Sequence, residues 1–390
     1  MKARVTTGAV AMLCASLLVA QPGSAGPSAP ALPSAPPVGT VQSTVEMGLM
    51  AQDSRVRNRD AAYSTGFNGT SIWVYGDTSL TVVGADGDAH ADNTSNTRTD
   101  LNAADGIAAG VEKLDSAGAP SEYIPRSNWE RFFNQVNDPD VCGTPSPEDP
   151  NCGQQYFNWP GQLVADPARN RVISFLSSGI RCGSIPCTAP QWWGAGVATW
   201  SPGGQWTRQE TGPPPDVGGW DTGILFGPGD EFGSSAAVVV GTTLYAYDCD
   251  PGSGWYEFNC FVARVALADV TNRAAWRFFA GGSTWSTNIA DAVEVFDGAT
   301  ANTVYFNTYL NKYMVVYGFD TVKYRTADNP WGPWSDPGVL FNAVPVNENG
   351  KLNYSAVAHP EYGSGQTFYV TYIHPTSVGG GTRLVRVNLQ

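Results

Sequence analysis

Short runs of alternating apolar and polar residues dominate the chain, and almost no segment has the periodicity of an amphipathic helix. The clearest pair of runs covers 61–67 and 71–75 and flanks Asn68-Gly69, a dipeptide that favours a two-residue β-hairpin turn. Four further pairs have the same organisation: 162–166 with 171–176, 234–240 with 243–247, 303–309 with 312–317, and 354–358 with 367–373. The pattern predicts an all-β protein built from hairpins.

More strand-like runs follow several hairpins, for example 196–200, 261–267 and 322–326. Units of strand, turn and strand that recur along a chain of this length are typical of a radially repeated architecture. The pattern therefore predicts a five-bladed β-propeller over residues 41–390. Its inner strands are expected to begin at Asp60, Trp159, Ser234, Thr303 and Tyr354. A β-sandwich is the alternative, but it does not readily explain the regular recurrence.

The first 40 residues have a different composition. Lys2 and Arg4 precede an apolar run over 9–20, and small residues at 23–25 offer a cleavage site, an order typical of a secretory signal peptide. Residues 26–40 are rich in Pro, Ala and Ser, which suits an extended linker. We therefore expect a signal peptide at 1–25, a linker at 26–40 and a secreted, extracellular mature protein. No later segment is expected to enter a membrane.

The charge and aromatic content narrow the choice of partners. The formal net charge is −13, so nucleic acids and anionic surfaces are unfavourable partners. The 13 Trp and 16 Tyr residues are many, and aromatic faces commonly hold neutral, polyhydroxylated ligands. Aromatic residues also fill cores, so their number is only an indication. We expect a monomer, and the aromatic content is compatible with a neutral, polyhydroxylated ligand.

The cysteines indicate an oxidising compartment. Apart from Cys14 they form three sequence-local pairs, namely Cys142 with Cys152, Cys182 with Cys187, and Cys249 with Cys260. In an exported protein disulfides are the natural interpretation, and local pairing would close three polar loops. A zinc site is the poorer explanation, because no pair has CxxC spacing and the chain has three His residues.

Two acids are expected to meet at the open end of the first hairpin. If the strands fold back about Asn68-Gly69, Asp60 lies opposite Asp77. Directly opposed like charges are unfavourable in a sheet, and one of two close carboxyls usually has a raised pKa. Such an arrangement indicates a site. The alternative is structural, because Asp77 also suits a turn.

Several segments together resemble a known group of proteins. They are Arg59-Asp60, the run 73–78 (WVYGDT), the run 306–313 (FNTYLNKY), the run 332–335 (GPWS) and the final hairpin beginning at 355–357 (SAV). From about Arg59 to the C-terminus the chain resembles the five-bladed glycoside hydrolases of the arabinanase and fructosidase type. Within that group it is most similar to a largely uncharacterised secreted family that includes endo-D-arabinanases. The resemblance implies hydrolysis of a furanose-containing polysaccharide such as an arabinan at the channel mouth.

The resemblance also implies catalytic residues. The family pattern has an acid at the start of the first inner strand, where Asp60 stands, and often one on the third blade, where Glu231 stands. Asp77 matches the Gly-Asp-Thr element by type and place. The second inner strand departs from the pattern, because the run 158–161 (NWPG) has no acid. Asp77 is a candidate for the missing carboxylate, and Asp221 and Asp230 are alternatives on the third blade.

Glycoside cleavage needs one protonated carboxyl and one ionised carboxylate. We expect Asp60 to be the ionised base or nucleophile, because Arg59 and nearby amides would favour its charge, and Glu231 to be the proton donor. Asp77 would support them electrostatically, or exchange roles with Glu231. Candidate substrate-binding residues are Tyr63, Arg126, Trp159, Trp220, Asp221 and His359. For most of these a structural role in packing or ion pairing is the stronger interpretation.

Other chemistries fit less well. The chain has no GxSxG, HExxH, phosphate-loop or dinucleotide fingerprint in a suitable context, and we expect no catalytic metal or cofactor. The loop 86–92 (DGDAHAD) could hold a structural calcium ion, although a solvated loop is the simpler account. A lectin-like propeller that binds glycans without cleaving them is the alternative function. Its sites would repeat in several blades, whereas the acids here are concentrated on the first and third.

Overall fold

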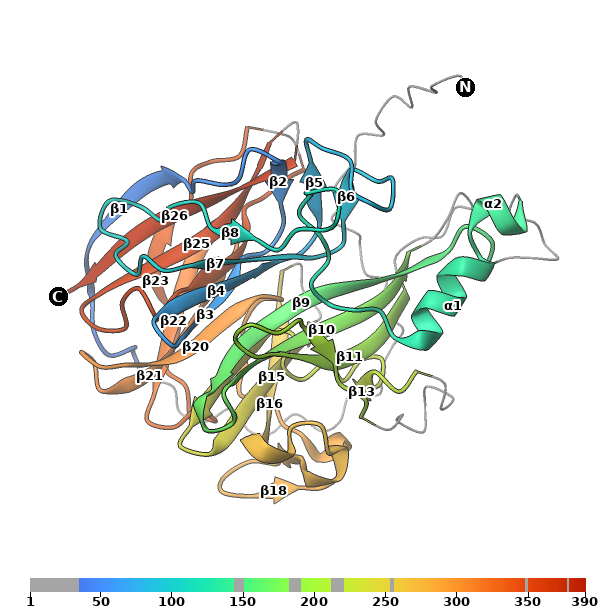
Figure 1. Cartoon of the computed structure of the whole chain (residues 1–390). Helices are drawn as coiled ribbons and strands as arrows, with labels where there is room; N and C mark the ends of the chain where they lie inside the picture. The colour runs from blue at the N-terminus through green and yellow to red at the C-terminus, as the bar shows by residue number, and fades with distance from the viewer. Residues whose placement is uncertain are drawn as a thin grey trace.

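The protein is nearly all β in a computed structural model, which describes residues 35–143, 151–181, 191–211, 221–252, 256–347, 350–376 and 379–390 (Figure 1). The α-helices of the described residues are the short α1 (Asn128–Val136) and α2 (Pro139–Cys142). No described helix has the length and apolarity needed to cross a membrane. The expected signal peptide and most of the expected linker lie outside the described residues.

All the strand pairs of the described residues are antiparallel, and the strands form six sheets. The hydrogen-bonded strand orders are as follows: β3 (Tyr63–Phe67), β4 (Thr70–Tyr75), β7 (Thr94–Arg98) and β8 (Val111–Glu112); β9 (Gln155–Asp166), β10 (Arg171–Arg181), β11 (Gln191–Trp200) and β12 (Thr207–Arg208), with β13 (Ile224–Phe226) beside β11; β14 (Ala236–Val240), β15 (Thr243–Pro251), β16 (Phe258–Ala266), β17 (Arg277–Phe279) and β18 (Trp285–Ser286), with β19 (Phe296–Asp297) beside β16; β20 (Asn302–Asn307), β21 (Lys312–Gly318), β22 (Thr321–Ala327) and β23 (Gly338–Asn342); β24 (Tyr354–Ala358), β25 (Thr367–Thr376), β26 (Gly379–Leu389) and β1 (Val41–Leu49); and the small sheet β2 (Val56–Arg59), β5 (Thr78–Leu80) and β6 (His90–Ala91). Short 3₁₀ turns lie at Pro167–Arg169, Leu267–Asp269, Arg273–Ala275 and Ile289–Asp291.

The first hairpin has the predicted register. Phe67 pairs with Thr70, and the two turn residues have positive φ, 51° at Asn68 and 75° at Gly69, as a tight hairpin turn between twisted strands requires. The pairing continues irregularly to the open end, where the N–H of Asp60 donates to the carbonyl of Asp77 at 2.8 Å. The turn therefore brings these two acids together as the sequence predicted.

The first strands of five sheets contact one another in succession. β3 contacts β9, β9 contacts β14, β14 contacts β20 and β20 contacts β24. Residues of β3, β9, β14 and β20, with Pro360 and Glu361 of the loop after β24, line a cavity of about 220 Å³. At the other edge of the last sheet, β1 pairs with β26, so the first and last described strands lie side by side (Figure 1). This arrangement places four strands from different sheets around one cavity.

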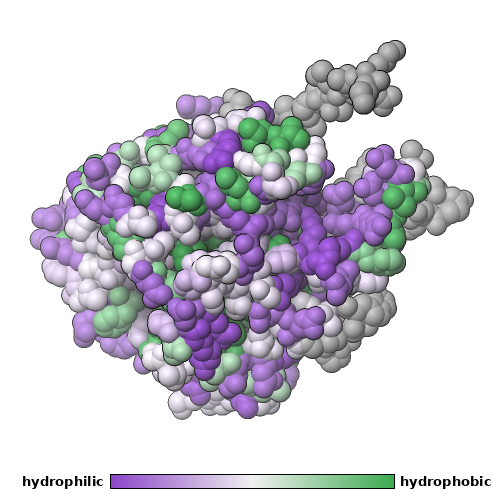
Figure 2. Space-filling model, viewed as in Figure 1, coloured by the Kyte–Doolittle hydropathy of each residue, from purple (hydrophilic) through white to green (hydrophobic). Residues whose placement is uncertain are grey.

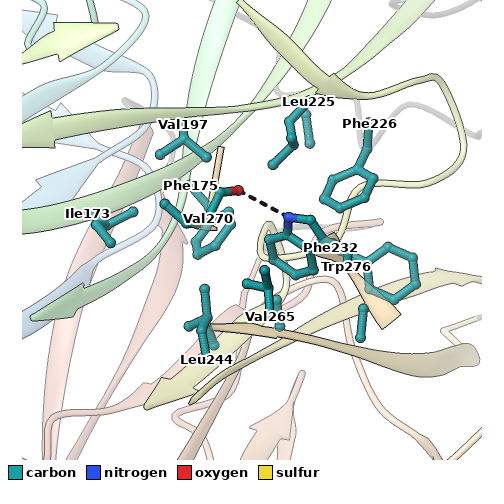
Figure 3. Close-up of a cluster of buried hydrophobic side chains, with 14 of the residues drawn as sticks. Ile173, Phe175, Val197, Leu225, Phe226, Phe232, Leu244, Val265, Val270 and Trp276 are labelled. Carbon is teal, nitrogen blue, oxygen red and sulfur yellow. Dashed lines mark hydrogen bonds between the residues drawn. The ribbon is translucent and has the colours of Figure 1, made fainter. Parts of the chain in front are cut away.

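Hydrophobic side chains fill the spaces between neighbouring sheets. In the cluster of Figure 3, Ile173 and Val197 of one sheet pack against Leu244 and Val265 of the next. Trp276 is 1% exposed and donates its indole N–H to the carbonyl of Val270 at 3.0 Å, so its only polar group is satisfied. Burial of each such side chain contributes roughly 1.5–3 kcal/mol. The packing fixes the strands whose ends carry the candidate site.

Two of the three predicted disulfides are confirmed. Cys142 is bonded to Cys152, and Cys249 is bonded to its register partner Cys260 across β15 and β16. The predicted partners of the third bond, Cys182 and Cys187, lie outside the described residues. The confirmed bonds close short loops, as expected from sequence-local pairing.

Candidate active site

Asp60 lies where β2 meets the first hairpin. Its carboxylate Oδ1 accepts the N–H of Ala61 at 2.7 Å, and the hydroxyl of Tyr354 lies beside it. Burial and the nearby charge of Asp77 raise the pKa of Asp60 to about 6. At neutral pH the carboxyl is therefore mostly ionised, but it accepts a proton more readily than an ordinary aspartate.

Arg59 does not stabilise the charge of Asp60, contrary to our expectation. Its guanidinium is buried, lies 2.9 Å from a carboxylate oxygen of Glu112 and stacks 4.1 Å from the ring centre of Tyr75. Successive side chains of a strand point to opposite faces, so Arg59 and Asp60 are directed apart. The pKa of Asp60 is consequently set by burial and Asp77, without a cation of its own.

Asp77 has a different environment. Its Oδ1 accepts the indole N–H of Trp159 at 2.9 Å and a guanidinium N–H of Arg181 at 2.5 Å. His90 lies 3.6 Å away, and both Arg181 and His90 also contact Asp92, at 2.7 and 3.7 Å. These two acids raise the pKa of His90 to about 9, so the imidazole is protonated at neutral pH. An ion-paired carboxylate is a poor proton donor, and Asp77 therefore suits an electrostatic role.

Glu231 lies in an acidic, cation-poor part of the site. Its Oε2 accepts the hydroxyl of Ser177 at 2.8 Å. Burial, with smaller contributions from Asp250 and Asp230, raises the pKa of Glu231 to about 7. Burial also raises the pKa of Asp250 to about 6 and that of the neighbouring Asp248 well above its usual range. Carboxyls that repel one another in this way favour retention of a proton on Glu231.

The loop that carries Glu231 is fixed by backbone contacts. The N–H of Glu231 donates to the carboxyl of Asp248 at 2.8 Å, and the Ser234 hydroxyl donates to the carbonyl of Glu231 at 2.6 Å. Across the sheets, a Cβ at Gly161 would lie 2.6 Å from the Cα of Ser234. The close approach of this loop explains why the second inner strand has a glycine here and no side chain.

A chain of contacts joins the three predicted catalytic acids. Asp60 bonds to Asp77 through the backbone, and Asp77 accepts the indole N–H of Trp159. Trp159 is the register partner of Ser177, whose hydroxyl donates to Glu231. The arrangement thus links the acids of the first and third sheets through one pair of strands of the second sheet.

Three predicted substrate-binding residues border this chain of contacts. Trp159 is half-buried against Asp77. Tyr63 is 5% exposed, and its hydroxyl lies 3.5 Å from the carbonyl of Ser234. Arg126 donates to Asp92 at 2.7 Å and to Glu122 at 2.9 Å, which connects it to the charge network around His90.

The other predicted binding residues lie elsewhere. His359 is fully buried, with its ring nitrogens 2.6 Å from the Ser64 hydroxyl and 2.7 Å from the Thr371 hydroxyl. Asp221 is also fully buried and accepts the N–H of Gly223 at 3.0 Å. Neither side chain reaches the surface, so their positions argue against direct contact with a sugar. Trp220 lies outside the described residues.

Among the described residues, one group of side chains could hold a metal ion, namely Asp77, His90 and Asp92. Their ligand atoms lie within 4.8 Å of one another, but the guanidinium of Arg181 bonds to both carboxylates and supplies the positive charge that a metal ion would bring. In the loop 86–92, backbone amides already donate to the carboxylates of Asp86 and Asp88. A calcium ion there would have to displace these bonds.

Several residues of this network were not predicted from the sequence. Arg181 and His90 contact Asp77 from positions 104 and 13 residues away in the chain. Asp248 and Asp250 belong to β15, which runs to Pro251 and so extends beyond the strand predicted at 243–247. Tyr354 was predicted to begin an inner strand, but its hydroxyl beside Asp60 was not anticipated. Figure 2 shows hydrophilic residues gathered between the regions of β6 and α1, where β10 also ends.

The described residues form a nearly all-β protein in which a chain of contacts links acids of different sheets. Residues 191–386 match the family described as "Domain of unknown function (DUF4185)", which is just over half of the chain. The chain belongs to this family. Comparison with curated proteins found no match.

Solved structures show a similar chain path. A suspected hydrolase from Bacteroides ovatus is similar over 87% of this chain and 86% of its own, with 14% identity and a TM-score of 0.54, and this similarity shows a shared fold. An endo-arabinase from Bacteroides thetaiotaomicron (10% identity, 88% of this chain and 97% of its own, TM-score 0.44) is more distant. So is an α-L-arabinofuranosidase from Podospora anserina (11% identity, 90% and 98%, TM-score 0.43).

Proposed function

We propose that this protein is a secreted glycoside hydrolase that cleaves a furanose-containing polysaccharide such as an arabinan. The observation that carries the proposal is the chain of contacts that links Asp60, through Asp77, Trp159 and Ser177, to Glu231. Asp60 and Glu231 are held in cation-poor surroundings, and their pKa values are about 6 and about 7. Hydrolysis of a glycosidic bond near neutral pH needs one ionised and one protonated carboxyl, and this pair meets that need.

The proposed fold is a five-bladed β-propeller. Its support is the succession of contacts between the first strands of five sheets, four of which line one cavity, and the pairing of β1 with β26. In this interpretation the site lies where inner strands begin, at the mouth of the central channel. The two disulfides and the signal-like start of the chain support secretion.

In the proposed mechanism Glu231 donates a proton to the leaving oxygen of the glycosidic bond. Asp60 acts as the ionised partner that activates water or attacks the sugar carbon. Asp77, which is held by Arg181 and His90, stabilises positive charge that develops on the sugar ring. Its charge also raises the pKa of Asp60, which keeps the basicity of Asp60 close to the working pH.

The test is release of reducing ends from arabinan, fructan and arabinogalactan by the purified mature protein, with the Glu231→Gln variant beside it. We expect release from at least one of these polymers by the native protein and a loss of at least about 10²-fold in the variant. Binding of a polymer without release of reducing ends would contradict hydrolysis and favour the lectin-like alternative. Equal activity of the variant would remove Glu231 from the mechanism.

A further inference from the structure

One face of the β9–β11 sheet carries a group of aromatic rings beside the acids. Phe157 and Trp192 both pair with Gly179, from either side of β10. Trp159 follows two residues after Phe157 and therefore points to the same face. Because Gly179 has no side chain, the rings of the two outer strands can meet above it.

The rings form a fixed and accessible surface. Phe157 is fully buried, and its ring centre lies 4.7 Å from that of Trp159 and 5.7 Å from that of Trp192. The two indoles are 5.5 Å apart and inclined by 67°. Both remain partly exposed. Phe157 thus supports two tryptophans whose outer surfaces are open.

The same face is continuous with the candidate active site. Trp159 donates its indole N–H to Asp77, and Ser177, its partner across the strands, donates to Glu231. Arg181, at the end of β10, lies 4.9 Å from the ring centre of Phe157 and also bonds to Asp77. The aromatic surface and the acids are therefore held by neighbouring residues of one sheet.

The geometry points to a carbohydrate-binding subsite formed by Trp159 and Trp192, which holds a sugar unit of a neutral polysaccharide chain next to the bond that is cleaved. The inference rests on the proposed function and deepens it, because it names the residues that hold a sugar unit beside the bond that is cleaved. Indole faces stack on the C–H faces of sugar rings while the hydroxyl groups remain in water.

The charges around the subsite select a neutral chain. The nearest cation, Arg181, is already bonded to Asp77 and Asp92. Glu231 lies close by, since it accepts the hydroxyl of Ser177, the register partner of Trp159, and Asp250 acts on Glu231 electrostatically. The formal net charge of the whole chain is −13. An anionic polysaccharide would be repelled by these acids and would find no free cation at the rings.

Trp193 provides a matched control. It is the neighbour of Trp192, but the strand directs it to the other face, where its ring centre lies 5.8 Å from that of Tyr156 at an angle of 90°. Trp193→Ala removes the same side chain from the same strand without touching the proposed subsite. Trp192→Phe keeps an aromatic ring at the subsite and should restore part of the binding.

The experiment measures binding and cleavage separately. Binding of arabinan, fructan, arabinogalactan and the anionic control polygalacturonate is measured by affinity electrophoresis, with the melting temperature of each variant as a folding check. We expect Trp192→Ala to weaken binding of a neutral polymer about fivefold to tenfold, in line with the loss of one aromatic contact. We expect Trp193→Ala to bind as the native protein does.

The outcomes separate this inference from the proposed function. Weakened binding in Trp192→Ala together with no release of reducing ends by the native protein supports the subsite and contradicts hydrolysis. Hydrolysis with unchanged binding in Trp192→Ala contradicts the subsite alone. The subsite is also overturned if the native protein binds none of the neutral polymers, binds polygalacturonate best, or loses binding equally in Trp193→Ala.

Discussion

Asp60 and Glu231 should set the pH range of activity. Their pKa values are about 6 and about 7, so the reactive pair, ionised Asp60 with protonated Glu231, is most populated between these values. Initial rates measured from pH 4 to 9 should fall as the pH drops through about 6 and again as it rises through about 7. A rate that stays constant up to pH 9 would be inconsistent with Glu231 as the proton donor.

The same two residues should reduce the stability of the folded protein at high pH. Each has a folded pKa above its unfolded value, so the native state binds more protons than the unfolded state, and stability falls as pH rises from about 4 to about 7. Asp60→Asn and Glu231→Gln should therefore melt at a higher temperature than the native protein at pH 8 and at nearly the same temperature at pH 4. Calorimetry at both pH values checks this, and a variant that melts lower at pH 8 would contradict it.

At the scale of elements, Gly233 controls where the Glu231 loop can lie. Its φ is +98°, and a Cβ there would meet the ring of Phe175 at 2.2 Å. Gly233→Ala should destabilise the protein by about 2 kcal/mol or more and lower activity by moving Glu231. Gly241→Ala is the control, because Gly241 also has a positive φ of 61° but nothing within 4 Å of the added Cβ. Stability is measured by chemical unfolding and activity by initial rate. If both variants lose equal stability and equal activity, the strain of a positive φ causes the losses and the contact with Phe175 does not.

The elements also show what could be predicted from the sequence. The hairpin about Asn68-Gly69 and the Asp60–Asp77 contact depend on local turn chemistry, which a sequence records. The cations around Asp77 depend on distant strands, since Arg181 lies 104 residues away, and a single sequence contains no signal for such pairing. Arg59 was expected to stabilise the charge of Asp60 because the two are neighbours in the sequence. Side chains alternate between the two faces of a strand, however, so the two residues are directed apart. Burial of Asp221 and His359 is likewise a tertiary property.

The whole molecule depends on contacts between the two ends of the described chain. β1 pairs with β26, and Glu46 of β1 bonds to Arg383 and Tyr372 at 2.9 and 3.0 Å. Without β1, strand β26 would expose an unpaired edge, and these side chains would lose their partner. The sheet that contains β24 would be loosened, together with Tyr354 beside Asp60.

A protein that starts at residue 50 should therefore melt at least about 5 °C below one that starts at residue 35. Loss of a paired strand costs several kcal/mol of folding free energy, and a change of 1 kcal/mol shifts the melting temperature by roughly 2–4 °C at this size. The longer form keeps β1 and lacks only residues that the structure does not describe, so it is the matched control. Differential scanning calorimetry of both forms measures the difference. Equal melting temperatures would show that β1 does not hold the ends of the chain together, and would remove the pairing of β1 with β26 as support for a closed propeller.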